Sequence, residues 1–381
     1  MALVLNEEQN LLKTSAKDFF TNNMPVSQLR KLRDSKDAVG YSTESWQQIV
    51  ELGWSGIIVE EEFGGLAFGY TGLGVVMEEA GRTLAASPLF ATCVLGSSAI
   101  TLAGSKAQKS DLLPQIVQGS LTLALAIEES ATHGPQRTRT TASKSGDGYT
   151  LNGEKVFVLD GHSADMLVVV ARTSGKPGDS SGLTLFLVDR NSAGVSVKRV
   201  FMADGRNAAT VTFSNVAVPA SAVLGTVDQG STALQDILSV GQILLAAEML
   251  GSLQEAFERT INYIKTRVQF DRHIGSLQAI QHRAAHMYAE IELAKSVVIA
   301  SLAVLDEGVR GDELAKQASL AKAKLAEVFL LTSSEGVQMH GGIGMTDDEE
   351  IGFFLKRART AEHTLGDIRY HQNRFGDLLA I

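Results

Sequence analysis

The chain has 381 residues, 44% of them apolar and 20% charged, which is the ordinary balance of a globular protein with two or three domains. Its 34 Lys and Arg residues against 43 Asp and Glu residues give a net charge of −9. That charge argues against nucleic acid as a general partner, although it allows a local basic pocket for a phosphate. The single cysteine, Cys93, excludes an internal disulfide and any zinc site built from cysteines.

The first residues contain no basic segment before acidic side chains appear, so we expect no signal peptide. The longest apolar runs, such as residues 166–171, are too short to cross a bilayer. We therefore expect a cytoplasmic protein without membrane contact.

The sequence predicts a first, helical domain over residues 1–118. Asn6 begins a capping-box pattern, after which apolar residues recur at helical spacing. Ser42 is a candidate cap for a later helix that stops at Gly53, and a further helix is expected to end near Gly81.

A second, β-rich domain is predicted over residues 119–226. The Asn152–Gly153 pair predicts a hairpin turn between two strand-like segments, and Lys155 after it is expected to be a solvated strand residue. Short apolar runs predict strands at residues 121–127, 166–171, 183–188 and 210–213.

The remainder, residues 227–381, is predicted to be helical. Apolar residues in 276–305 follow the period of a helix, and Asp312 opens a second long helix. Two long helices with two flanking ones predict a four-helix bundle. The expected fold class is therefore α+β multidomain: a helical domain, a middle β-barrel or sandwich domain, and a C-terminal four-helix bundle.

Two polar motifs stand out on these apolar helices. Arg267 and Phe270 are followed by Gln278, and much later Gln338 precedes Gly341 and Gly342. A guanidinium suits a diphosphate, carboxamides can hydrogen-bond a sugar or a phosphate, and paired glycines let the backbone approach a ligand closely. The motifs together indicate a bound dinucleotide.

The order and spacing of these motifs resemble the flavin-binding signature of the acyl-CoA dehydrogenases. The resemblance extends along nearly the whole chain, through residues 62–65 and 152–155. It implies FAD as the cofactor, with the Arg and Gln side chains of one subunit reaching the FAD held mainly by its neighbour. It also implies α,β-desaturation of an acyl-CoA thioester, by abstraction of a Cα proton and hydride transfer to flavin N5, and the helical–β–bundle architecture.

The catalytic carboxylate is where this chain departs from the family. Gly366 falls at the usual position of the Glu base, and Gly241 falls at the position that a minority of members use. Glu248 lies two helical turns beyond Gly241, on a face of small and apolar residues, so it is the candidate base. The alternative is a structural Glu paired with a basic residue across the bundle. The neighbouring Asp367 is interpreted as a turn or cap residue.

The middle domain also departs from the family pattern. Of the usual loop that contacts flavin, only Glu129 stays in register. Phe157 can stack on the flavin ring, whereas Leu159 replaces the hydroxyl expected near N5. Gln242 aligns with an Arg that commonly helps to fix CoA.

The bundle keeps the flavin motif, whereas the base and the β domain are altered. This combination is similar to the small subunits of two-gene bacterial acyl-CoA dehydrogenases, such as that of pimeloyl-CoA dehydrogenase. The resemblance implies a homo- or hetero-tetramer with a second acyl-CoA dehydrogenase-like subunit, and an acceptor of the electron-transfer flavoprotein type. Two other functions stay open: a non-catalytic subunit that completes a partner's flavin site, and an acyl-CoA oxidase. We expect no metal site, because His282 and His286 have no acidic third ligand at a standard spacing.

Overall fold

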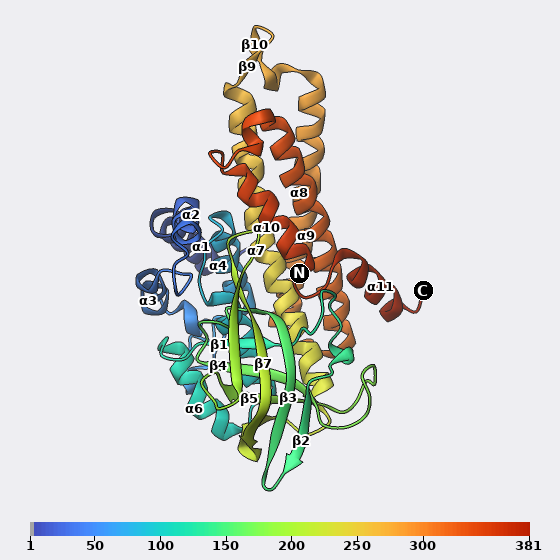
Figure 1. Ribbon diagram of the computed structural model, residues 1–381. Helices are drawn as coiled ribbons and strands as arrows, with labels where there is room; N and C mark the ends of the chain where they lie inside the picture. The colour runs from blue at the N-terminus through green and yellow to red at the C-terminus, as the bar shows by residue number, and fades with distance from the viewer. Residues whose placement is uncertain (1–3) are drawn as a thin grey trace. The chain divides into compact units, whose positions relative to one another are not determined.

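A computed structural model describes residues 4–381, which form two compact units (Figure 1). We call the first the helical unit; it takes the N-terminal segment up to Lys31, Tyr70–Ala85 and Gln242–Ile381. The second, the sheet unit, takes Leu32–Gly69 and Ala86–Gly241. The long helix α7 (Gly230–Thr266) runs from the sheet unit into the helical unit.

The helical unit confirms the predicted bundle. Its two other long helices, α8 (Gln278–Asp306) and α9 (Gly311–His340), pack against each other, and α10 and α11 pack on α9. Helix α10 spans Ile351–His363 and α11 spans Ile368–Leu379. The unit also contains α1 (Glu7–Asn23), α2 (Val26–Ser35, which ends in the sheet unit), α4 (Tyr70–Arg82), β9 (Val268–Gln269) and β10 (Arg272–His273).

Helix α7 is long and apolar enough to cross a membrane by length and composition alone. Its most apolar window is, however, 94% buried inside the protein. Burial on that scale is typical of the central helix of a folded domain, whose apolar residues face neighbouring elements all round.

The predicted caps form as the sequence indicates. The Asn6 side chain accepts from the Gln9 backbone N–H at 2.8 Å, and the Gln9 side chain accepts from the Asn6 N–H, which completes the capping box of α1. Ser42 caps α3 (Thr43–Glu51) in the sheet unit, and Gly53 follows it with a left-handed φ of 77°. The other α-helices of the sheet unit are α5 (Ser97–Ala103) and α6 (Lys106–Val117), and a π-helix spans Leu89–Gly96.

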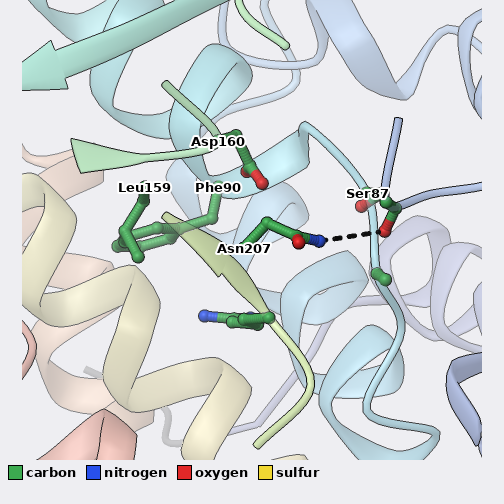
Figure 2. A pocket seen from close by; sticks show the side chains of 8 residues that line it. Ser87, Phe90, Leu159, Asp160 and Asn207 are labelled. Atoms are coloured by element: carbon green, nitrogen blue, oxygen red, sulfur yellow. Dashed lines mark hydrogen bonds between the residues drawn. The ribbon is translucent and has the colours of Figure 1, made fainter. Parts of the chain in front are cut away.

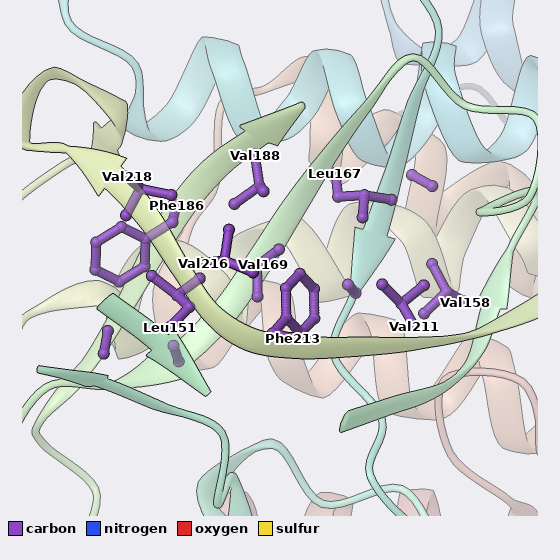
Figure 3. Close-up of a cluster of buried hydrophobic side chains, with 14 of the residues drawn as sticks. Leu151, Val158, Leu167, Val169, Phe186, Val188, Val211, Phe213, Val216 and Val218 are labelled. Carbon is purple, nitrogen blue, oxygen red and sulfur yellow. The ribbon is translucent and has the colours of Figure 1, made fainter. Parts of the chain in front are cut away.

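The sheet unit contains one mixed sheet in the strand order β6-β7-β3-β2-β4-β5-β8, with β1 added beside β4. Its two halves share a single hydrophobic core, in which Leu151 and Val211 of one half meet Val169 and Phe186 of the other (Figure 3). A sheet that encloses one core in this way has the sandwich or barrel arrangement that the sequence predicts. The strands are β1 (Leu123–Ala126), β2 (Thr141–Ser145), β3 (Gly148–Leu159), β4 (Met166–Arg172), β5 (Leu183–Asp189), β6 (Val195–Phe201), β7 (Asn207–Pro219) and β8 (Val223–Leu224).

The predicted hairpin turn at Asn152–Gly153 is wrong. Strand β3 continues through these residues, and the turn lies six residues earlier, at Gly146 and Asp147, where Ser145 pairs with Gly148. Gly153 is instead a point of close approach: a Cβ there would lie 2.5 Å from Thr140 Oγ1, and the pairing of β3 with β7 shifts register beside it.

Candidate functional site

The first flavin motif lies at a tight hairpin between α7 and α8. Strands β9 and β10 are joined by Phe270 and Asp271, whose φ angles of 53° and 58° are those of a two-residue hairpin turn. The Arg267 carbonyl accepts from the Ile274 N–H at 2.9 Å, which fixes the base of the hairpin. Phe270 is 82% exposed at the tip.

The second motif lies at the same end of the helical unit. A small apolar cluster formed by Ile264, Met287 and Met339 joins the end of α7, the first half of α8 and the end of α9. The Tyr263 ring stacks on His340 with centroids 4.2 Å apart, and its hydroxyl donates to the His340 carbonyl at 3.2 Å. His340 therefore packs within the bundle. Gln278 and Gln338 thus lie at neighbouring helix ends, and Arg267 and Phe270 lie in the hairpin beside them.

These polar side chains are open to a ligand. Arg267, Gln278 and Gln338 are all exposed, and none of their side chains hydrogen-bonds another residue within 4–381. Gly341 has a φ of 67°, and no atom lies within 4 Å of the Cβ that either Gly341 or Gly342 would carry. A surface with unbonded donors beside open glycines fits the diphosphate and sugar of a dinucleotide.

Phe157 and Leu159 belong to the sheet unit. Phe157 lies at a register shift of β3, has a φ of 51° and is 47% exposed, so its ring is accessible for stacking. Leu159 instead lines a cavity with Phe90, Asp160 and Asn207 (Figure 2). The cavity measures about 20 Å³, which suits a water molecule and is too small for an acyl chain.

The expectation that Lys155 is solvated is wrong. Its side chain is fully buried, and Nζ donates to Glu129 Oε1 at 2.7 Å and to the Ile127 carbonyl at 3.0 Å. Burial lowers the pKa of Lys155 to about 8, although Glu129 opposes that change. Glu129 also accepts from the N–H groups of Arg139 and Thr140, so this carboxylate organises the loop that follows β1.

Glu248 lies in a buried ion pair. Its Oε1 accepts from Arg357 Nη1 of α10 at 2.9 Å, and the two residues are 2% and 1% exposed. This geometry matches the alternative given above, a structural Glu paired with a basic residue across the bundle. A carboxylate in an ion pair with a guanidinium is a weak proton acceptor. The role of Glu248 as catalytic base stays a prediction.

Position 366 accommodates glycine and resists any larger residue. Gly366 has a φ of 110°, and a Cβ there would lie 2.6 Å from both His371 Nε2 and Tyr370 Cδ1. The preceding Leu365 also has a left-handed φ, of 57°. Because L side chains rarely adopt such a φ, a glutamate at this position would be strained as well as crowded. The adjacent Asp367 caps α11 through the Tyr370 N–H, as the sequence indicates.

Three buried side chains fix the loop around Gly366. Lys322 Nζ donates to the carbonyls of Glu362 and Gly366, both at 2.9 Å. The Leu365 carbonyl accepts from Gln242 Nε2 and from His371 Nε2, both at 3.0 Å. Burial lowers the pKa of Lys322 to about 7. The loop is therefore a rigid part of the core.

Sequence reasoning did not single out Lys322 or Arg357. A signal for Lys322 exists, because it falls on the inner face of α9 with Ala318, Ser319 and Leu325. A lysine on such a face must hydrogen-bond internally. For metals, residues 4–381 contain no group of three His, Cys, Asp or Glu side chains that could hold an ion.

The chain matches family models for the acyl-CoA dehydrogenase N-terminal domain over residues 6–120, the middle domain over 125–216 and the C-terminal domain over 228–377. It is 32% identical over 320 residues to the short/branched chain specific acyl-CoA dehydrogenase of Rattus norvegicus mitochondria, covering 82% of this chain and 73% of that protein.

Two solved structures share the fold. A chain of the steroid ACAD Tcur3481-Tcur3483 is 31% identical with a TM-score of 0.88, over 98% of each chain. A chain of the ChsE4-ChsE5 complex from Mycobacterium tuberculosis is 25% identical with a TM-score of 0.89, over 100% of this chain and 99% of that one. The protein therefore belongs to the acyl-CoA dehydrogenases, a family of FAD-dependent oxidoreductases.

Proposed function

We propose that this chain is one subunit of a heteromeric FAD-dependent enzyme that introduces an α,β double bond into an acyl-CoA thioester. The observation that carries the proposal is the exposed end of the helical unit, where Arg267, Gln278 and Gln338 are unbonded within the described chain. A surface of this kind is suited to a cofactor that a neighbouring subunit also contacts. When bound, FAD accepts the hydride removed from the acyl Cβ.

The residues of this chain would bind and orient that cofactor. The Arg267 guanidinium would pair with the diphosphate, while Gln278 and Gln338 would donate carboxamide N–H groups to phosphate or ribose oxygens. Gly341 and Gly342 leave room for the nucleotide, and Phe270 would cover it. Electrons would pass to an acceptor of the electron-transfer flavoprotein type, with the cytoplasm as the expected location.

The heteromer is supported by two observations. A chain of similar fold comes from the ChsE4-ChsE5 complex, which has two components. Positions 366 and 241 carry no carboxylate here, and Glu248 is engaged by Arg357. If the base comes from the partner, this chain would be the non-catalytic subunit that completes the flavin site, and the Glu248–Arg357 geometry favours this second role.

A variant that lacks the Glu248 carboxylate but keeps the fold distinguishes the catalytic subunit from the non-catalytic one. In the double variant Glu248→Leu/Arg357→Met, both buried charges are replaced by apolar side chains of similar size, a change that is often neutral for stability. The variant is assembled with the second subunit, and bleaching of the flavin by a panel of acyl-CoAs is measured. Bleaching at the wild-type rate assigns the base to the partner, whereas a folded assembly that is no longer bleached identifies Glu248 as the base.

A further inference from the structure

One buried arginine of the sheet unit has no carboxylate partner. Arg172, the last residue of β4, is 5% exposed and forms no ion pair with any residue within 4–381. A buried guanidinium destabilises the fold unless its N–H groups are hydrogen-bonded. The acceptors of these N–H groups therefore indicate what the charge holds in place.

Five backbone carbonyls surround the Arg172 guanidinium, and we call them the carbonyl cage. They are the carbonyls of Gln136 at 2.7 Å, Thr138 at 3.1 Å, Ser181 at 2.9 Å, and Ser174 and Asp179 at 3.4 Å. Nε donates to one of them, and Nη1 and Nη2 donate to two each. Since a guanidinium has five N–H groups, every donor of Arg172 has an acceptor.

The carbonyl cage joins two loops that are distant in sequence. Two of its acceptors belong to the β1–β2 loop, residues 127–140, and three belong to the β4–β5 loop, residues 173–182. The loops also bond directly, because the Gly178 N–H donates to the Gln136 carbonyl at 2.8 Å. The backbone N–H of Arg172 donates to the Thr140 carbonyl at 2.8 Å. The two loops are thus hydrogen-bonded together around one side chain.

The β1–β2 loop is also the wall of a cavity. This cavity has a volume of about 350 Å³, which is within the range of ligand pockets, and its other wall is Gly153 and Glu154 of β3. Glu129 fixes the end of the loop by accepting from the N–H groups of Arg139 and Thr140. The carbonyl cage fixes its middle, so the shape of the cavity wall depends on Arg172.

We propose that Arg172 is a positioning residue that fixes the cavity wall and couples the β1–β2 loop to the β4–β5 loop, so that a ligand bound at the first loop also orders the second. A lysine could not replace it, because an ammonium group has three N–H donors for five acceptors. The proposal rests on the function proposed above in one respect only, the choice of FAD as the ligand in the second test.

The first test is hydrogen exchange of the full-length chain, read by mass spectrometry without FAD. Gly182 has a φ of 85°, and a Cβ there would lie 2.2 Å from the Ser174 carbonyl oxygen, so Gly182→Ala displaces one acceptor of the carbonyl cage. We expect about tenfold faster exchange in the β4–β5 loop and also in residues 130–139, because hydrogen bonds to a charged group are lost. Gly146→Ala is the matched control, since Gly146 has a φ of 57° and nothing lies within 4 Å of its Cβ. Faster exchange in the β4–β5 loop alone would overturn the proposal.

The second test compares Arg172→Lys with the wild type, each assembled with the second subunit and measured with and without FAD. In the wild type, FAD should slow exchange in both loops; in Arg172→Lys, it should slow exchange in the β1–β2 loop alone and bind about tenfold more weakly. Arg139→Lys, the same change at an exposed position of the β1–β2 loop, should leave the exchange of both loops without FAD as in the wild type. Equal protection of the β4–β5 loop in the wild type and Arg172→Lys would contradict the coupling. Protection of neither loop in the wild type would overturn FAD as the ligand here, and the glycine variants decide the coupling independently of FAD.

Discussion

At the scale of single residues, the unusual feature of the helical unit is buried charge. Glu248, Arg357 and Lys322 are each at most 2% exposed, and each is compensated by a specific partner. A buried charged group destabilises the fold unless a partner compensates it. We therefore expect substitutions at these residues to change the free energy of unfolding. Two predictions follow, one for the Glu248–Arg357 pair and one for Lys322.

Glu248→Gln should lower the free energy of unfolding by about 3–5 kcal/mol, because it removes the charge of one partner of the buried Glu248–Arg357 ion pair. Urea unfolding of the full-length chain measures the change. Glu248→Leu/Arg357→Met should recover most of the loss, since neither charge remains. A Glu248→Gln variant as stable as wild type would show that the pair contributes little to the fold.

Lys322 predicts a rise of stability with pH. Its pKa is about 7 in the folded protein and about 10.4 in an unfolded chain. Between these values the unfolded chain holds a proton that the folded chain has released, so the unfolding free energy increases with pH across this window and is flat below it.

The measurement is the difference in unfolding free energy between wild type and Lys322→Met from pH 6 to 10, where the contributions of other groups cancel. Lys295→Met on α8, which removes a half-buried lysine of the same unit, is the control. A difference that does not change with pH would contradict the account.

At the scale of elements, the loop between α10 and α11 determines what the chain can do at the family's usual base position. Its two left-handed residues and its three buried donors make it rigid. The sequence indicated that the glutamate is missing. It could not show that the backbone here also excludes a larger side chain, because a φ angle and a neighbour's position are not encoded in spacing.

Gly366→Ala should therefore cost more stability than Gly308→Ala. Both glycines have a positive φ, of 110° and 75°, but only Gly366 is crowded; nothing lies within 4 Å of the Cβ at 308. We expect about 1–2 kcal/mol at Gly308 from backbone strain, and at least about 1 kcal/mol more at Gly366 from the clash with His371 and Tyr370. Equal losses in thermal or urea unfolding would show that the loop relaxes around a side chain.

The elements also show how far local sequence signals reach. The caps at Asn6 and Ser42 were predictable because cap and helix are adjacent in the chain. The Asn152–Gly153 pair was misread as a turn, because Gly153 is required by the close approach of Thr140, which immediately precedes β2. The partner of Glu248 lies 109 residues away, so only the need for some basic partner could be foreseen.

At the scale of the whole molecule, the two units interleave in sequence, and the flavin motifs fall entirely in the helical unit. The ends of α7, α8 and α9, which carry these motifs, meet through the apolar packing of Ile264, Met287 and Met339. The family and the architecture were predictable because both motifs keep the family's order and spacing along the chain. The limits of the three domains, at residues 118 and 226, stay predictions.

The most direct test of the subunit role is the flavin content of the assembled enzyme. The chain is purified alone and together with the second acyl-CoA dehydrogenase-like subunit, as wild type, Arg267→Ala/Gln338→Ala, or the exposed control Lys265→Ala, and the flavin bound per assembly is determined by absorbance. The account predicts stoichiometric flavin in the wild-type and control assemblies and loss of most of it in the double variant, with the assembly otherwise intact. Full flavin retention in the double variant would contradict it.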